Sequence, residues 1–289
     1  MATTAPYGSW SSPISAELVA AGGVSLDEVR VEGGGVYWVE GRPLEGGRQV
    51  VCRADPGSPP EDVTGERFNA RTRVHEYGGG SYAVHGGTVF FSNYADQRLY
   101  RQDPGAAPVP LTPEPPDRAA DRYADACPSP DGRRLLCVRE RHQDGRVDNE
   151  LVALPADGGG QPVVLAAGRD FYASPRISPD GRRLAWLEWD HPDMPWDATE
   201  LRLAELAGDS LAGDPVTVAG GPGESVFQPE WSPDGVLHLT SDRTGWWNLY
   251  RVAAGGALEA LAPAEEEFGH PQWVFGMSTY AFLPGARIA

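Results

Sequence analysis

The chain has 289 residues, 40% of them hydrophobic, and its 36 glycines and 27 prolines indicate a folded core joined by many tight turns. Its 41 acidic residues outnumber 24 basic residues, all of them arginine, and the net charge is −17. This charge argues against a nucleic-acid or anionic-membrane partner, because both bind cationic surfaces. No apolar run approaches the about 18 residues of a membrane span, and residues 1–10 lack the basic start of a secretory signal, so we expect a cytoplasmic protein.

Residues 16–21 predict a short helix, and the rest of the chain predicts β-strands. Glycine turns precede β-rich runs repeatedly: Gly34 before 36–39, Gly87 before 88–91, Gly132 before 135–138, Gly181 before 184–187, Gly235 before 237–240, and Gly276 before 279–282. These glycines lie 41 to 54 residues apart in the sequence. That interval matches a four-stranded propeller blade of roughly 40–50 residues.

The tetrapeptide SPDG occurs three times, at residues 129–132, 178–181 and 232–235. Its serine opens the turn with a side-chain hydrogen bond, its proline presets φ, and its glycine accepts the left-handed conformation that closes a hairpin. We therefore interpret the tetrapeptide as a turn signature and its aspartate as a structural residue rather than a catalytic one.

The later half of each repeat also predicts strands. Third strands are expected at 98–101, 150–153, 200–203 and 248–251, and outer strands follow them, for example at 163–165 and 216–218. The predicted fold class is all-β: an incomplete β-propeller of four-stranded blades, with five blades plus the start of a sixth, from a ring of seven. Only six residues follow Leu283, and the missing outer strands would leave open sheet edges. We therefore expect this chain to be a segment of a longer protein.

Five longer stretches are more specific than a generic propeller. They are YGSWSSPI at 7–14, YWVEGRP at 37–43 with EGGR at 45–48, RVHEYGGG at 73–80, HPDMPWD at 191–197 and SDRTGWWN at 241–248. Together they resemble bacterial serine peptidases of the prolyl oligopeptidase family, of the aminopeptidase or acylaminoacyl-peptidase type, over essentially the whole chain. The resemblance implies a propeller that caps a C-terminal α/β-hydrolase domain holding a Ser-Asp-His triad.

The resemblance also implies a division into parts. Residues 1–30 are expected to form an N-terminal segment that packs on the propeller or on the absent hydrolase domain, and residues 31–289 the propeller, truncated within its sixth blade. The hydrolase nucleophile of the family sits in Gly-x-Ser-x-Gly. Every serine of this sequence, for example Ser81, Ser225 and Ser278, lacks the flanking glycines. The sequence therefore predicts no catalytic residue in this segment, although the intact parent would be an enzyme.

The expected function is that of a gating domain. The propeller would restrict access to, and help bind substrate for, a peptidase that hydrolyses N-terminal aminoacyl or acylaminoacyl amide bonds of small peptides. Its partners would be the hydrolase domain of the same chain and a short peptide or aminoacyl-amide substrate. Two alternatives stay open: a free-standing TolB-like propeller that binds protein partners, and a metal-dependent propeller lactonase.

Glu76 and Tyr77 are the first candidate substrate-binding residues. In the resembled family a propeller carboxylate often pairs with the free amino group of the substrate, through a charge-assisted hydrogen bond. Glu76 lies in a glycine-flanked stretch where the backbone must approach something closely. The alternative is that Glu76 and its neighbours only anchor a blade junction, with Arg71 or Arg73 as ion-pair partner.

The other candidates come from two loops. Trp196 and Asp197 lie in an insertion over residues 190–199, which either carries function or is a rigid hairpin whose tryptophan packs on a neighbouring blade. Arg243 and Trp247 form a polar–aromatic hairpin suited to domain contact, substrate lining or packing. No pair of histidines has metal-ligand spacing, and no phosphate-binding loop is present, so no metal or cofactor is predicted.

Overall fold

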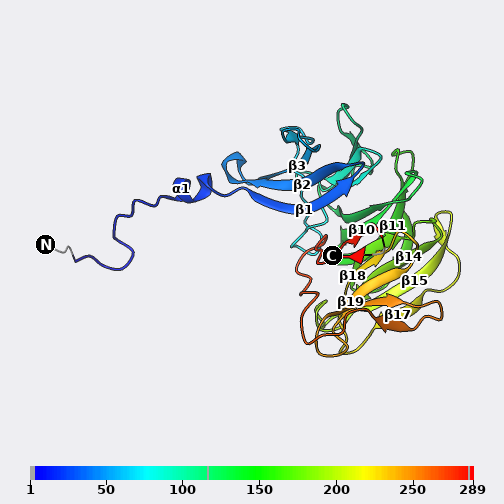
Figure 1. The fold of residues 1–289 in the computed structure, drawn as a ribbon. Helices are drawn as coiled ribbons and strands as arrows, with labels where there is room; N and C mark the ends of the chain where they lie inside the picture. The colour runs from blue at the N-terminus through cyan, green and yellow to red at the C-terminus, as the bar shows by residue number, and fades with distance from the viewer. Residues whose placement is uncertain (1–3, 116, 286) are drawn as a thin grey trace.

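The computed structural model describes residues 4–115, 117–285 and 287–289. Five antiparallel sheets, each with four strands in sequence order, follow one another and surround a common axis as the blades of a β-propeller (Figure 1). This confirms the all-β propeller of four-stranded blades; ring closure with seven blades stays a prediction. In the described part of the chain, no helix is long and apolar enough to cross a membrane.

The blades divide the chain into consecutive units. Blade one contains β1 (Ser25–Glu32), β2 (Gly35–Arg42), β3 (Arg48–Ala54) and β4 (Glu61–Asp62). Blade two contains β5 (Tyr82–His85), β6 (Thr88–Ser92), β7 (Leu99–Gln102) and β8 (Val109–Pro110). Blade three contains β9 (Asp121–Pro128), β10 (Arg134–Gln143), β11 (Arg146–Pro155) and β12 (Val163–Ala167). Blade four contains β13 (Phe171–Ile177), β14 (Arg183–Trp189), β15 (Glu200–Ala207) and β17 (Val216–Gly220), with β16 (Ser210–Leu211) on the end of β15. Blade five contains β18 (Val226–Trp231), β19 (Leu237–Ser241), β20 (Asn248–Val252) and β21 (Leu258–Ala260). Every predicted second, third and outer strand of these blades lies within one of them, except that Arg98, the predicted start of the third strand of blade two, precedes β7.

The SPDG turns behave as their chemistry predicts. In the turn that joins β13 to β14, the Ser178 hydroxyl donates to Asp180 at 2.6 Å and accepts from the Arg183 amide at 2.9 Å. Gly181 has φ 74° and its amide donates to the Ser178 carbonyl. The other two copies make the same serine–aspartate contact. The tetrapeptide is therefore a self-contained hairpin clamp.

The sixth turn was wrongly placed at Gly276. The last hairpin joins β22 (Phe282–Leu283) to β23 (Arg287–Ile288), so its turn holds Pro284 and Gly285. Gly285 follows Gly235 by 50 residues, which fits the repeat better than Gly276 does. This hairpin lies beside blade five, where the Tyr280 hydroxyl donates to the Gln228 carbonyl.

The N-terminal segment differs from the prediction in its boundary. The predicted short helix is α1 (Ala16–Ala21), but the first strand of blade one already begins at Ser25 rather than at residue 31, because β1 pairs with β2 from its start. The part before β1 extends away from the blades (Figure 1), apart from α1, which lies beside the 3-10 helix η1 (Pro43–Glu45). Among the described residues before β1, the contact with blade one is thus made through α1; packing of this segment on the propeller or on a hydrolase domain stays a prediction. Residues 1–3 lie outside the described residues.

Each blade has one residue with a left-handed backbone at an equivalent place, in or just before its first strand. These residues are Glu28 (φ 54°), Gly80 (φ 55°), Asp125 (φ 53°), Ser174 (φ 53°) and Gln228 (φ 48°). Four of them lie where the register between first and second strand shifts, so they are β-bulges. The first strands of blades two to five are in contact in turn, and the Tyr82 hydroxyl of β5 donates to the Glu28 carbonyl of β1, which places the bulges around the propeller axis.

The bulges connect neighbouring blades. The Glu28 carboxylate of blade one accepts a hydrogen bond from the Ser81 amide of blade two at 3.0 Å. The Asp125 carboxylate of blade three accepts one from the Ser174 amide of blade four at 2.7 Å. The hydrophobic core fills the remaining space between blades, with the side chains of Tyr82, Tyr123, Tyr172 and Trp186 and their neighbours almost wholly buried. The blades are thus joined by apolar packing outside and by polar bonds at the axis.

Candidate functional site

Two long connections meet at one end of the propeller axis. Residues 63–81 join blade one to blade two, and residues 261–281 lead from blade five to the last hairpin. Gly79 and Phe275 form a parallel bridge between these connections, and the Phe275 amide donates to the Gly78 carbonyl at 2.9 Å. The meeting point positions His75, Tyr77, Trp273 and Phe275 of the candidate site described below.

Gly79 and Gly80 are required by this close approach. Gly79 has φ 82°, and a Cβ atom on it would lie 2.3 Å from the Phe275 carbonyl oxygen. A Cβ atom on Gly80 would lie 2.8 Å from the Phe275 side chain and 3.0 Å from the Asp125 backbone. The glycine-flanked stretch therefore brings its backbone close to the connection that holds Phe275.

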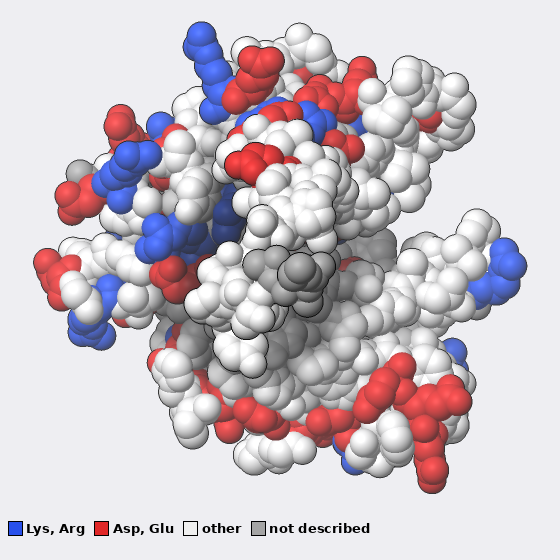
Figure 2. Space-filling view, turned by 90° about the vertical axis from the view of Figure 1, so that its left-hand side faces the viewer, with Lys and Arg blue, Asp and Glu red and all other residues white. Residues whose placement is uncertain are grey.

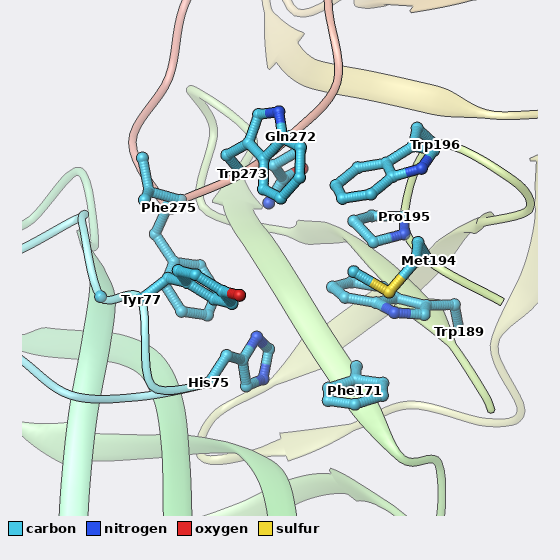
Figure 3. A pocket seen from close by; sticks show the side chains of 12 residues that line it. His75, Tyr77, Phe171, Trp189, Met194, Pro195, Trp196, Gln272, Trp273 and Phe275 are labelled. Atoms are coloured by element: carbon cyan, nitrogen blue, oxygen red, sulfur yellow. The ribbon is translucent and has the colours of Figure 1, made fainter. Parts of the chain in front are cut away.

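A pocket with about 630 Å³ of empty volume, its open mouth included, lies beside this bridge (Figure 3). Figure 3 shows Phe275, Tyr77 and His75 along one side, with Trp196, Pro195, Met194, Trp189 and Phe171 facing them and Trp273 between. The remaining lining residues are Gly78, Gln272 and Val274. We call this the aromatic pocket.

The walls of the aromatic pocket are aromatic pairs. Phe171 and Trp189, from the start of β13 and the end of β14, stack with ring centroids 5.2 Å apart and planes 15° from parallel. Trp196 and Trp273 meet at 4.5 Å, although they come from different connections. Such flat faces favour a flat apolar group between them.

His75 forms the floor near the bridge. Its ring centroid lies 4.8 Å from that of Phe275 and 5.0 Å from that of Phe171. Burial lowers the pKa of His75 to about 4, so the imidazole is neutral at pH 7. Its backbone has φ 54°, and its amide donates to the buried Glu140 carboxylate at 2.7 Å, which holds this left-handed turn in place.

Glu76 follows in the same turn, with φ 63° and a side chain that is 63% exposed. Arg122 contacts one carboxylate oxygen at 2.8 Å and Arg73 the other at 3.3 Å. The hydrogen bond from Arg122 is the largest cause that lowers the pKa of Glu76, so the carboxylate is ionised at neutral pH. The expected partner Arg73 is observed, whereas Arg71 lies over the Tyr94 ring instead.

Of the other predicted residues, Tyr77 and Trp196 line the aromatic pocket and Asp197 supports it. The Tyr77 side chain is 66% exposed at the mouth, and its ring contacts Trp273 edge-on. Asp197 accepts a hydrogen bond from the Met194 amide at 3.0 Å, which closes the loop that carries Trp196. Trp196 therefore packs on a neighbouring connection and lines a pocket at the same time.

Arg243 and Trp247 do not belong to this site. Trp247 is 7% exposed and stacks on Phe227, with its amide bonded to Glu267 at 2.8 Å. Arg243 lies over the Tyr250 ring and 3.7 Å from a Glu224 carboxylate oxygen. The structure thus assigns Trp247 a packing contact within blade five and separates it from the aromatic pocket.

Sequence reasoning missed most of the pocket walls. Phe171 and Trp189 lie at strand ends, where the sequence does not distinguish them from core residues. Gln272, Trp273 and Phe275 come directly before Gly276, at which the sequence predicts the turn of a sixth blade. One signal was available in the sequence. Aromatic residues are dense beside Pro271, in a segment that has no third or fourth strand after it. Among the described residues, no three His, Cys, Asp or Glu side chains gather as a metal site would require.

Three solved structures match 99% of this chain at 40–44% identity, and all three are of puromycin-hydrolysing proteins. A puromycin-hydrolysing peptidase from Mycobacterium tuberculosis is 44% identical, with a TM-score of 0.88 over 99% of this chain and 46% of that one. A puromycin hydrolase is 40% identical, with a TM-score of 0.89 and the same coverage, and a variant of it has been solved in complex with PGG. A structure from a study of two prolyl endopeptidases, 12% identical with a TM-score of 0.57, shares the fold. No protein-family profile and no curated protein matches. The chain spans less than half the length of the two puromycin-hydrolysing proteins.

Proposed function

Because this chain belongs to the prolyl oligopeptidase family of serine peptidases and matches their propeller domain, we propose that it gates and helps bind substrate for a peptidase. The peptidase would hydrolyse N-terminal aminoacyl or acylaminoacyl amide bonds of small peptides. The observation that carries the proposal is the identity of 40–44% over 99% of this chain to puromycin-hydrolysing proteins.

The catalytic Ser, Asp and His would come from an α/β-hydrolase domain of the same polypeptide, because no Gly-x-Ser-x-Gly occurs in these 289 residues. The propeller would contribute the face that carries the two long connections. That face combines an ionised carboxylate, Glu76, with the aromatic pocket, and both elements suit a short peptide with a free amino group.

Gating is supported by the bridge at the propeller axis. Phe275 packs against Gly80, and a Cβ atom on Gly276 would lie 3.6 Å from the Glu28 carboxyl carbon, so residues 275–276 sit against the ring of bulges. A substrate would therefore reach the facing domain past the aromatic pocket and not through the axis. On the side that bears the N-terminal segment, arginines and carboxylates are interspersed on the left flank, and carboxylates gather along the lower edge (Figure 2).

Further blades are proposed to close the ring between blade one and the last hairpin. Leu26, Val29 and Val31 of β1 are 64%, 65% and 72% exposed. Exposed apolar residues on a strand at the edge of a sheet normally face another element of the fold. A neighbouring blade would cover them as blades two to four cover each other.

The proposed function is tested by extending the chain with its natural downstream reading frame and measuring hydrolysis of aminoacyl p-nitroanilides. We expect the extended protein to hydrolyse them and the 289-residue chain to be inactive. A reading frame that encodes no hydrolase domain, or equal activity of the 289-residue chain, would contradict the proposal.

A further inference from the structure

The aromatic pocket holds two buried polar atoms that make no hydrogen bond of normal geometry. Among the described residues, Gln272 Oε1 is shielded from solvent and accepts no hydrogen bond within the protein. His75 Nε2 is also shielded and makes no hydrogen bond of normal geometry, although the Asn149 side chain lies close enough to act on the pKa of His75. Both residues line the aromatic pocket. An unsatisfied buried polar atom destabilises the folded state, so a protein keeps it where a ligand or water completes its bonding.

The two atoms differ in what they require. An amide oxygen only accepts, so Gln272 Oε1 calls for a donor such as a phenol O–H or an indole N–H. The neutral imidazole nitrogen of His75 either donates or accepts, according to its tautomer. In Figure 3 the two residues lie at opposite ends of the aromatic pocket, with the aromatic walls between them.

The charge of the lining selects the kind of group further. The described residues that line the aromatic pocket include no aspartate, glutamate or arginine, and His75 is neutral at pH 7. Trp189 with Phe171 and Trp196 with Trp273 present flat faces. A neutral flat ring gains from both faces, whereas an aliphatic chain gains only from burial.

We infer that the aromatic pocket binds an aromatic side chain with a hydrogen-bond donor on its ring, as in a tyrosyl or tryptophanyl residue of a peptide or aminoacyl amide. This deepens the proposed function, on which the identification of the ligand as a substrate rests. The ring lies between the aromatic walls, and its donor bonds Gln272 Oε1. Tyr77 and Trp273, which are 66% and 55% exposed, form the mouth through which the side chain enters.

The inference is tested on the 289-residue chain by tryptophan-fluorescence titration with tyrosinamide, phenylalaninamide and leucinamide. We expect tyrosinamide to bind at least about fivefold more tightly than leucinamide. Trp273→Ala should weaken tyrosinamide binding at least about fivefold. Trp246→Ala is the matched control, because Trp246, like Trp273, is an exposed tryptophan on a loop (40% exposed), but it does not line the pocket. This variant should leave binding unchanged.

Gln272→Leu isolates the polar contact, since it keeps the size of the side chain and removes the acceptor. It should reduce the preference for tyrosinamide over phenylalaninamide about fivefold or more without weakening phenylalaninamide. The inference is overturned if leucinamide or tetramethylammonium binds as tightly as tyrosinamide, or if Trp273→Ala binds like the unchanged chain. Because this binding is measured without catalysis, an inactive extended protein would contradict the proposed function alone.

Discussion

Phe275 donates its amide hydrogen to the Gly78 carbonyl and forms a parallel bridge with Gly79, although these residues belong to connections at opposite ends of the chain. The contact brings His75 and Tyr77 to one wall of the aromatic pocket and Trp273 to its mouth. The bridge therefore decides whether the candidate site exists, since neither connection forms the pocket alone.

Gly79→Ala should destabilise the chain by about 2–4 kcal/mol, because the new Cβ would clash with the Phe275 backbone and the residue has a left-handed φ. Urea unfolding followed by tryptophan fluorescence measures this. Gly46→Ala is the control, since Gly46 also has a positive φ but no atom near its Cβ position, and it should cost only about 1 kcal/mol. Equal costs for the two variants would contradict the close approach.

Glu28 should make the stability of the chain depend on pH. Burial is the largest cause that raises the pKa of Glu28 to about 7, from an ordinary value of 4.5. The folded state then binds more protons than the unfolded state between these values, so stability falls as pH rises from about 5 to 8. Glu28→Gln should remove this fall. The free energy of unfolding of the variant, minus that of the original chain, should therefore be higher at pH 8 than at pH 5, by at most about 3 kcal/mol.

Glu32→Gln is the matched control for Glu28, because Glu32 lies on the same strand and also accepts an amide hydrogen bond from blade two, from Gly86 at 2.6 Å, but this bond is exposed whereas that of Glu28 is part-buried. Its free energy of unfolding should change by a similar amount at both pH values. Urea unfolding at several pH values gives both curves. A Glu28→Gln variant whose difference from the original chain is constant with pH would show that Glu28 does not titrate as described.

Glu76→Gln in the extended protein should lower kcat/KM for substrates with a free amino group about tenfold or more, while N-acylated substrates are unaffected. The reason is the loss of a negative charge that the ammonium group would contact. Glu259→Gln is the control, because Glu259 is a half-exposed carboxylate that pairs only with Arg251. An equal effect on both substrate classes would assign Glu76 a purely structural role, as anchor of Arg122.

Ser178→Ala should lower the free energy of unfolding by about 1–2 kcal/mol, because the buried hydroxyl donates to Asp180 and accepts from the Arg183 amide. Ser210→Ala removes an exposed hairpin hydroxyl that bonds only the Ala207 carbonyl, and it should change stability by less than about 0.5 kcal/mol. Thermal unfolding compares the two. Tyrosinamide binding should be the same in both variants, and a loss in Ser178→Ala alone would reopen a functional role for the SPDG turn.

The blades could be predicted because their signals are local. A hairpin clamp such as 178–181 needs only its own residues, and strands such as β10 alternate or cluster apolar residues in a recognisable way. The same reasoning wrongly predicts the sixth turn at Gly276, because it treats that glycine as the mark of a hairpin, whereas the hairpin turn lies at Pro284 and Gly285. Gly276 has φ 75° for another reason: a Cβ atom there would lie 3.1 Å from the Gly80 amide nitrogen.

The candidate site was predicted in part. Tyr77 and Trp196 were identified from stretches that resemble the peptidase family, and they do lie in one pocket. Trp247, chosen on the same ground, packs inside blade five. Resemblance marks residues that matter to the fold or the function, and it does not separate these two roles.

Hairpin chemistry and apolar patterning, which act between residues close in sequence, were sufficient to predict the five blades and their order. The aromatic pocket and the ring of bulges depend on contacts between residues about 50 to 200 positions apart, such as Glu28 with Ser81 and Gly79 with Phe275. Nothing in a local pattern places glutamate or aspartate at positive φ; the hydrogen bond to the next blade holds it there. Only the packed tertiary structure decides such positions, because the partner that stabilises them arrives through folding.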